Sequence, residues 1–316
     1  MQKGVCDRLI INFTPTGMIP TKDMTPYVPI TPGEIVSDVL EAYDLGITMV
    51  HLHARDMKTG QPTYRAKIYA EIIASIRKHA PDLILCVSLS GRTFKEFKER
   101  AEPLELDGDL KPDMGSLTLS SLNFNKQASM NEPDMIKALA RKMREKGIKA
   151  ELEAFDAGMI NFAHYLIKKG LIVAPHYFNL ILGNVACAQA DILHAGVMLR
   201  DLPDQSVWSF GGVGNYQLPM NSISISIGGG VRIGLEDNIW YDKQRTKLAR
   251  NIDLLRRIHA ISEANERLIM SSRELRQKLN LEDGSGKYGM RSLTSGEDLL
   301  LRMKSFHTHS GQYLDL

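Results

Sequence analysis

The chain has few cysteines, almost no net charge and no long apolar run. Its three cysteines, Cys6, Cys86 and Cys187, lie far apart and form no C-x-x-C pair. Scattered cysteines in odd number indicate reduced thiols rather than a disulfide-stapled secreted protein. A formal net charge of +2 argues against nucleic acid or an anionic membrane as the main partner.

Membrane and export signals are also missing from the sequence. No segment is apolar over the roughly 20 residues that span a bilayer, and the first residues lack the apolar centre of a signal peptide. The 43% hydrophobic and 24% charged residues are ordinary for a well-cored globular protein. We therefore expect a cytoplasmic protein that binds neither membrane nor nucleic acid.

Apolar, strand-like segments alternate with helical patterns along most of the chain. The strand predictions are 8–13, 47–53, 83–90, 113–121, 149–155, 176–182, 206–210 and 231–234. The helix predictions are 31–43, 64–79, 94–101, 133–146, 157–169, 185–199, 218–227, 242–259 and 263–279. Eight such units favour a (β/α)₈ TIM barrel with its site at the carboxyl ends of the strands. An open doubly wound sheet is second, because the first β-α turn lacks G-x-G-x-x-G.

Two details of this reading depend on the barrel. Residues 222–227 alternate strictly and by themselves indicate a strand, but a helix must lie between consecutive parallel strands, so we predict a helix. We expect one domain over 1–316, with the barrel at about 8–260 and C-terminal helices and a tail at 261–316. Residues 295–316 are predicted to pack on a partner subunit.

A pair of histidines closes the second predicted strand. His51 and His53 are two residues apart, so their side chains point to the same side of the strand. Two imidazoles at this spacing can hold one divalent ion, each with a bond of about 2 Å. H-x-H alone is equally consistent with two hydrogen-bonded histidines in a half-buried strand.

Polar side chains also end five other predicted strands, where a barrel carries its chemistry. They are Thr14, Thr16, Ser88, Ser90, Arg92, Thr118, Ser120, Ser121, Asn123, Glu151, Glu153, Arg232, Glu236 and Asp237. Each alone has a structural explanation, such as helix capping. Together they indicate a site, in which Glu236 completes a His-His-carboxylate set and Arg232 can hold a substrate carboxylate.

The motifs resemble those of the beta-keto acid cleavage enzymes, the group that includes 3-keto-5-aminohexanoate cleavage enzymes. The similarity runs from Ile11 to about Asp242. It rests on Thr16-Gly17, on the segment from His51 to Asp56, on Pro112-Asp113-Met114, Ser116-Leu117 and Asn123-Phe124, on Glu153, Phe155-Asp156 and Gly158-Met159, and on the segment from Val231 to Asn238.

The resemblance implies a zinc-dependent TIM barrel that cleaves a β-keto acid in a retro-Claisen manner. The acid and acetyl-CoA would give acetoacetate and a new acyl-CoA. One Zn²⁺ per chain would bind His51, His53 and Glu236, although iron, cobalt or manganese accept the same ligands. Asp237 with Arg232 would move protons. Such enzymes are usually homo-oligomers, often tetramers.

Further site residues follow from the same resemblance. Ser88, Thr118 and Glu153 are placed with the catalytic residues, and Thr16, Ile19, Ser90, Arg92 and Asn123 with the substrate. The family's pattern after strand three is replaced here by the segment from Ser88 to Arg92, so either serine could be the catalytic one, with Ser88 preferred.

The keto acid's side chain is read from two positions. Relatives that take an amino-substituted acid carry an acidic residue where this chain has Ile19, so the side chain is expected to be neutral or apolar rather than cationic. Arg92 leaves a second reading open: pointing inward, it would bind a second carboxylate, and pointing outward it would be solvated. Lys95, Lys98 and Arg100 are candidates for the CoA phosphates, but a solvated helix face is preferred for them.

Two other functions compete. An amidohydrolase-like metal hydrolase also carries H-x-H on a barrel strand, but it needs further histidines on strands five and six. His176 begins strand six at the wrong end. A non-catalytic barrel that binds a small carboxylate is the third possibility, and the intact set of polar residues argues against it.

Overall fold

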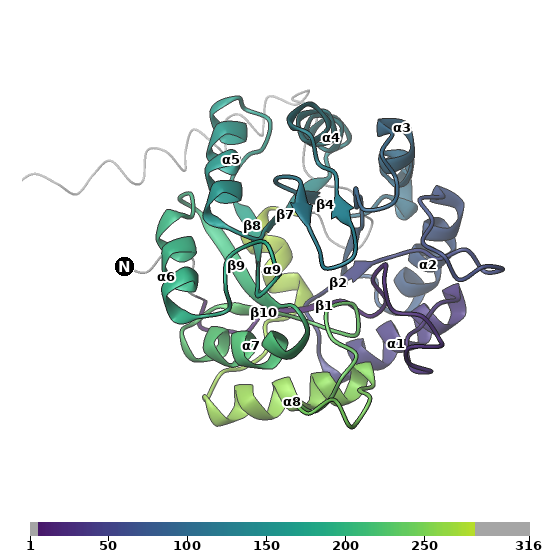
Figure 1. The fold of residues 1–316 in the computed structure, drawn as a ribbon. Coiled ribbons are helices and arrows are strands. Elements are labelled where there is room, and N and C mark those ends of the chain that lie inside the picture. The colour runs from purple at the N-terminus through teal and green to yellow at the C-terminus, as the bar shows by residue number, and fades with distance from the viewer. Residues whose placement is uncertain (1–5, 282–316) are drawn as a thin grey trace, which may run out of the picture.

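The computed structural model describes residues 6–281, and it confirms the predicted barrel. Parallel strands close in the order β1-β10-β9-β8-β7-β4-β3-β2, with the helices around them (Figure 1). The barrel strands are β1 Ile11–Phe13, β2 Met49–Leu52, β3 Ile84–Val87, β4 Met114–Thr118, β7 Lys149–Ala154, β8 His176–Leu182, β9 Ser206–Gly212 and β10 Gly230–Ile233. A small hairpin, β5 Leu122–Asn123 and β6 Ala128–Ser129, follows β4.

Helices connect and flank these strands. They are α1 Pro32–Leu45, α2 Ala66–His79, α3 Phe97–Arg100, α4 Pro133–Lys146, α5 Ala157–Lys168, α6 Ile192–Asp201, α7 Gln217–Ser226, α8 Asn251–Ala264 and α9 Ser272–Leu279. The segment 222–227 is helical, as the parallel connection requires. α1 begins as predicted, because Thr31 and Glu34 form a reciprocal capping box and Pro32 occupies the first turn.

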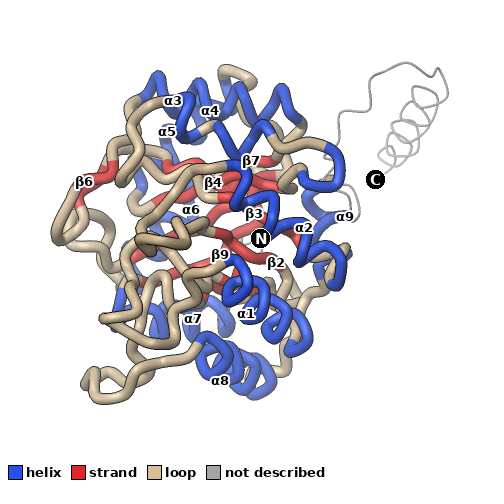
Figure 2. The backbone as a smooth tube through the Cα atoms, turned by 90° about the vertical axis from the view of Figure 1, so that its right-hand side faces the viewer, coloured by secondary structure: helices blue, strands red, loops and turns tan. Residues whose placement is uncertain are grey.

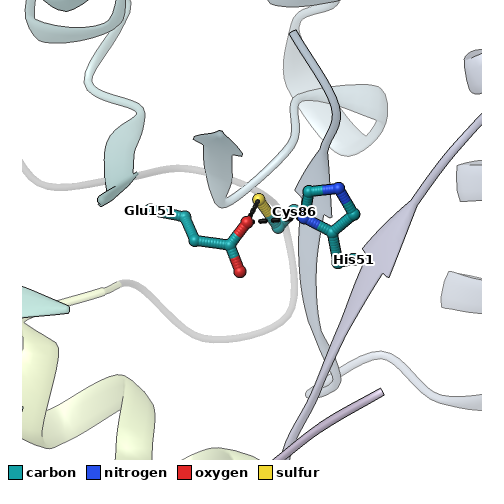
Figure 3. A group of neighbouring side chains, drawn as sticks. All are labelled: His51, Cys86 and Glu151. Atoms are coloured by element: carbon teal, nitrogen blue, oxygen red, sulfur yellow. Dashed lines mark hydrogen bonds and ion pairs between the residues drawn. The ribbon is translucent and has the colours of Figure 1, made fainter. Parts of the chain in front are cut away.

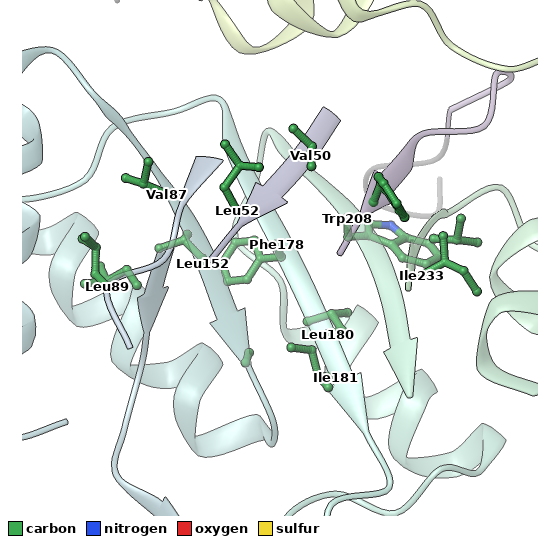
Figure 4. Close-up of a cluster of buried hydrophobic side chains, with 14 of the residues drawn as sticks. Val50, Leu52, Val87, Leu89, Leu152, Phe178, Leu180, Ile181, Trp208 and Ile233 are labelled. Atoms are coloured by element: carbon green, nitrogen blue, oxygen red, sulfur yellow. The ribbon is translucent and has the colours of Figure 1, made fainter. Parts of the chain in front are cut away.

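Alternation along each strand separates two environments. In β2, Val50 and Leu52 face the helices, and in β7 Leu152 does the same (Figure 4). The residues between them point into the barrel, where Met49 joins a separate inner cluster. Since successive strand residues point to opposite faces, His51, Glu151 and Glu153 are directed inward.

Three predicted helices differ from the structure. The helix predicted for 242–259 begins only at Asn251, because Asp242 accepts backbone hydrogen bonds from Thr246 and Lys247 and fixes a loop. The helix predicted for 263–279 is interrupted, and Ile269 instead bridges to Leu9. The helix predicted for 185–199 begins at Ile192, where Asp191 caps it.

The last described helix closes the amino end of the barrel. Leu275 and Leu279 of α9 pack with inner residues such as Met49 and Met114. Figure 2 shows α9 on the right and β6, which belongs to a loop at the carboxyl ends of the strands, on the left. The helix α9 and the carboxyl-end loops therefore lie on opposite sides of the barrel. The amino end is therefore filled by the chain itself.

Within residues 6–281, none of the helices combines the length and apolarity that crossing a membrane requires. The predicted partner contact of 295–316 lies outside the described residues, and the single-domain division of the chain stays a prediction.

Candidate active site

A cavity of about 520 Å³ opens at the carboxyl ends of the strands. Its volume is typical of small-molecule sites. The loop after β1 contributes Met18, Ile19 and Met24 to its wall. Its polar and charged lining residues include His51, His53, Ser88, Ser90, Arg92, Thr118, Lys126, Glu153, Arg232, Glu236, Asp237 and Arg245.

Three predicted metal ligands converge in this cavity. Nε2 of His51 lies 3.2 Å from Nε2 of His53, which lies 3.2 Å from Oε1 of Glu236. The three ligand atoms lie within 4.8 Å of one another. The structure therefore brings together residues that are far apart in the sequence.

The donor set fits a divalent cation. Two facing ring nitrogens and a carboxylate are the ligands that zinc accepts. The second oxygen of Glu236, Oε2, is buried and has no hydrogen-bond partner among the described residues. An unsatisfied buried carboxylate oxygen is costly, and a bound cation would satisfy it.

The carboxylate of Glu151 points toward both His51 and Cys86 (Figure 3). Its Oε2 is 2.5 Å from Nδ1 of His51 and accepts a 3.1 Å contact from the Cys86 thiol. Its Oε1 accepts amide hydrogen bonds from Asn12 and Asn179, at 2.7 and 2.8 Å. Both oxygens are satisfied, so Glu151 orients His51 with Nδ1 as donor and Nε2 free toward the cavity.

The ligand atoms of His51, Cys86 and Glu151 also lie within 4.8 Å of one another, close enough to share a metal ion. Their atoms are already bonded to one another, however, and burial raises the pKa of the Cys86 thiol well above its ordinary value. Cys86 is fully buried and belongs to the inner hydrophobic cluster. We interpret this group as the support of His51 rather than as a second metal site.

Arg232 is surrounded by three carboxylates. Its Nη2 donates to Glu236 at 2.7 Å, its Nε to Asp237 at 2.8 Å, and its Nη1 lies 3.5 Å from Glu153. The bidentate grip of Arg232 on a substrate carboxylate stays a prediction. The nitrogens of Arg232 are occupied by the protein's own acids.

Burial and Arg232 act unequally on these acids. Burial favours a raised pKa for Glu236, but Arg232, His53 and His51 outweigh it and hold that pKa well below its ordinary value. For Asp237 burial prevails over Arg232 and raises the pKa. Glu236 therefore remains a carboxylate ligand, while Asp237 is closer to exchanging a proton.

The pKa values of His51 and His53 are also shifted in opposite directions. Burial lowers the pKa of His53 to about 4. Burial also acts to lower that of His51, but Glu151 and Glu236 raise it to about 9.

The rest of the H-x-H motif is structural. Arg55 is buried and donates to the carbonyls of Gly17, Pro20 and Gly60, which fixes the loop that carries Ile19. Gly17 has φ +65°, and a Cβ on it would lie 2.6 Å from Cγ of Glu236. The Thr16-Gly17 motif therefore supports the metal carboxylate by leaving room for it.

The other predicted site residues divide into two groups. Those lining the cavity are Ile19, Ser88, Ser90, Arg92, Thr118 and Glu153, and the Thr118 hydroxyl donates to Glu153 at 2.7 Å. Thr16 and Asn123 do not line it. Thr16 is buried, and Asn123 is exposed at the β5–β6 hairpin.

The candidates for the CoA phosphates are not supported by their positions. Lys95 and Lys98 are exposed and do not line the cavity. Arg100 is buried, and it donates to the carbonyls of Leu89 and Met130 and to the amide oxygen of Asn131. Both readings of Arg100, phosphate ligand and solvated surface, are therefore wrong.

The sequence places Glu151 among the polar strand ends but gives it no partner, and it indicates no role for Asn12, Asn179, Lys126 or Arg245. The signal for Glu151 was present: two glutamates at i and i+2 on one strand share a face, and both are buried. Its partner His51 is 100 residues away, so no local pattern pairs them.

The hydrolase alternative is not favoured by the fold. His176 is the first residue of β8, at the opposite end of the barrel from the cavity. The cavity-lining residues of β7 and β8 include no histidine.

Fold and site together define a barrel enzyme with two histidines and a carboxylate gathered beside an arginine-bound aspartate. A model of the beta-keto acid cleavage enzyme family matches residues 8–281, and the chain belongs to that family.

Curated relatives agree with this assignment. A 3-keto-5-aminohexanoate cleavage enzyme from Fusobacterium nucleatum is 34% identical, over 87% of this chain and 99% of its own. A 3-oxoadipate:acetyl-CoA acetyltransferase from Cupriavidus necator is 36% identical, over 86% and 94%. Among solved structures, the oxaloacetate complex of ObcA matches with a TM-score of 0.68 at 20% identity, over 82% of this chain and 68% of that chain. That likeness shows the shared barrel. The homologues are acetyl-CoA-dependent beta-keto acid cleavage enzymes or transferases, and this chain is an enzyme of that type.

Proposed function

We propose that the protein is a zinc-dependent beta-keto acid cleavage enzyme whose keto acid carries no cationic side chain. The keto acid R–CO–CH₂–COO⁻ and acetyl-CoA would give acetoacetate and R–CO–CoA. The observation that supports this most strongly is the convergence of His51, His53 and Glu236 beside the Arg232–Asp237 pair.

Bond changes assign the work to these residues. One new bond joins C2 of the keto acid to the acetyl carbonyl carbon, while the bond from that carbon to the CoA sulfur breaks. The released CoA thiolate then bonds to C3, and the C2–C3 bond breaks, so that R–CO–CoA and acetoacetate separate. C2 must therefore lose a proton before the first step and regain it later. Asp237 would carry that proton, because Arg232 orients its carboxylate and burial raises its pKa.

Other groups would bind the oxygens. Zinc, when held by His51, His53 and Glu236, would polarise the keto acid's oxygens as a Lewis acid. The hydroxyls of Ser88 and Thr118 would donate to the oxyanions that form at the attacked carbonyls. Ser88 is preferred over Ser90, because the Ser90 hydroxyl already accepts the Arg92 amide at 3.3 Å.

The cavity wall supports a side chain that is not cationic. Ile19 lines the cavity and offers no carboxylate to an ammonium group. The carboxylates that do line the cavity are paired with Arg232. The names of the relatives include both an amino-substituted and a dicarboxylic keto acid, so family membership leaves the side chain open. A cytoplasmic location and a homotetramer belong to the same proposal.

The test is an assay of purified protein against a panel of β-keto acids, with and without acetyl-CoA, following acetoacetate and acyl-CoA by mass. Acetoacetate should form only with acetyl-CoA, and His51→Ala or a chelator should abolish it, with activity returning when zinc is added to the chelated wild type. Turnover without acetyl-CoA would overturn the proposal in favour of a hydrolase.

A further inference from the structure

The positive charges that line the cavity are not all paired with its carboxylates. Four cationic residues line it, together with three carboxylates. All three carboxylates, Glu153, Glu236 and Asp237, form ion pairs with Arg232. The acids are therefore committed to one arginine, and the cations Arg92, Lys126 and Arg245 remain.

Arg92 differs from the other two remaining cations in its surroundings. Lys126 and Arg245 are exposed, so water stabilises their charges, whereas Arg92 is half-buried. Within residues 6–281, no carboxylate forms an ion pair with Arg92. A guanidinium that has lost part of its hydration without gaining an anion is poised to bind a carboxylate of a ligand.

The guanidinium of Arg92 is also held in place. Its Cζ lies 3.7 Å from the centre of the Phe124 ring. Phe124 in turn packs edge-on against Phe155, with ring centres 5.8 Å apart. A guanidinium stacked by its face keeps its N–H groups free at the edge, and these match the two oxygens of a carboxylate.

Arg92 lies within electrostatic reach of the proposed metal site. Burial lowers its pKa, while Glu236, Asp237 and Glu153 raise it. The remaining wall is largely apolar, with Ile19, Met24 and Ile181 among its residues. One end of an elongated ligand would therefore contact the proposed metal ligands, and its other end would contact Arg92. The methylene groups between the two ends would lie against the apolar wall.

We propose that Arg92 is the specificity-determining residue for a keto acid whose side chain ends in a carboxylate. This inference rests on the proposed function. In R–CO–CH₂–COO⁻, R would be a short methylene chain with a terminal carboxylate, and R would leave unchanged in the acyl-CoA. The 2-carboxylate stays with C2 and leaves in acetoacetate.

The test compares two acids of equal length. 3-Oxoadipate and 3-oxohexanoate differ only in a terminal carboxylate or methyl group. Wild-type kcat/KM should favour 3-oxoadipate by about 10–100-fold, the range expected for a charge-assisted contact. Arg92→Gln should remove that preference, mainly through a higher KM for 3-oxoadipate, because Arg92 would contact the terminal carboxylate and not the reacting atoms.

A matched control exists in the same chain. Arg65 also stacks on a ring, that of Tyr64, but its side chain is 61% exposed and does not line the cavity. Arg65→Gln should keep the wild-type preference. Arg92→Lys should restore part of it, because an ammonium keeps the charge and loses the two-pronged geometry. Circular dichroism and thermal midpoints would show that the variants fold.

A binding measurement separates this inference from the proposed function. Calorimetry of 3-oxoadipate without acetyl-CoA should show binding that Arg92→Gln weakens by about 10-fold or more. Such binding without turnover would overturn the cleavage reaction and keep the role of Arg92. Equal kcat/KM for the two acids, or equal binding by wild type and Arg92→Gln, would overturn the role of Arg92 whatever the turnover.

Discussion

The two ends of the barrel both bury charge, but they do so differently. At the amino end, Asp113 accepts from Arg276 at 2.9 Å with each of its oxygens, and also from Arg77 and the Leu85 amide. Both Asp113 oxygens are therefore occupied. At the carboxyl end, Glu236 keeps a buried oxygen without a partner, and two imidazole nitrogens face each other beside it.

This difference separates architecture from function. Charges that are buried and fully paired hold elements together, as Arg276 of α9 does when it also binds the carbonyls of Asp82 and Leu83. Arg77 at the amino end also keeps two buried nitrogens without a partner among the described residues, but a guanidinium is no ligand for a cation. A buried carboxylate oxygen without a partner, beside two facing imidazole nitrogens, is costly to retain and indicates a bound cation. The comparison therefore predicts a role in stability for Asp113 and supports the proposed metal binding by Glu236.

The largest effect should come from Glu236→Gln. Loss of the anionic ligand should release the metal and lower kcat/KM by roughly 10³-fold or more, because the metal contributes several kcal/mol to the transition state. The thermal midpoint of metal-free protein should change little, since Arg232 keeps Asp237 and Glu153. Metal content per chain, by mass spectrometry, and steady-state kinetics measure both. Full metal content in the variant would refute the ligand assignment.

Asp113→Asn should show the opposite pattern. Leaving Arg276 and Arg77 without their anion should reduce the free energy of unfolding by about 3 kcal/mol, as expected for a broken buried pair. Metal content and kcat should stay near wild type below the midpoint. Urea and thermal unfolding measure the loss, and exposed Asp134→Asn is the control. A stable but metal-free Asp113→Asn protein would contradict the division between the two ends.

Glu151→Gln should have a smaller effect, on metal affinity. The amide would offer an N–H to Nδ1 of His51 and shift the ring proton to Nε2, the atom that should hold the metal. Zinc affinity should fall by about 10–100-fold, as for other groups that orient metal-bound histidines.

Nitrogen chemical shifts of His51 report the tautomer directly and would not move if Glu151 were only structural. Glu105→Gln is the control, because Glu105 is a surface acid paired with Lys142 and Lys146. An unchanged tautomer in Glu151→Gln would remove the orienting role.

Gly17→Ala should give the smallest change of the four. Its Cβ would overlap Glu236, and φ +65° is unfavourable for alanine, so we expect a loss of about 1–3 kcal/mol in stability and about 10-fold in metal affinity, the lower end of the range for groups that support a ligand. Gly196→Ala in α6, where nothing lies within 4 Å of the added Cβ, should be neutral or stabilising. Equal behaviour of the two variants would show that Glu236 tolerates displacement.

Helix boundaries show where local patterns stop being sufficient. The start of α1 was predicted because Thr31, Pro32 and Glu34 act within one turn. The start of α8 was not, because the Asp242 side chain accepts from the Thr246 and Lys247 amides and forms a loop where a helix was predicted. The interruption before α9 depends on pairing of Ile269 with Leu9, a contact that no local pattern contains.

The sequence by itself determined the barrel, because strand and helix periods are local. It also placed His51, His53 and Glu236, the proposed metal ligands, at the ends of strands that a barrel must bring to one mouth. Only the tertiary structure decided which charges are free. In the structure Arg232 pairs with three acids, and Glu151 lies within hydrogen-bonding distance of His51. Arg100 is buried against carbonyls, and Arg92 lines the cavity. The physical reason is that pairing depends on distance in space: Glu151 is 100 residues from His51, Glu153 is 79 from Arg232, and Met130 is 30 from Arg100.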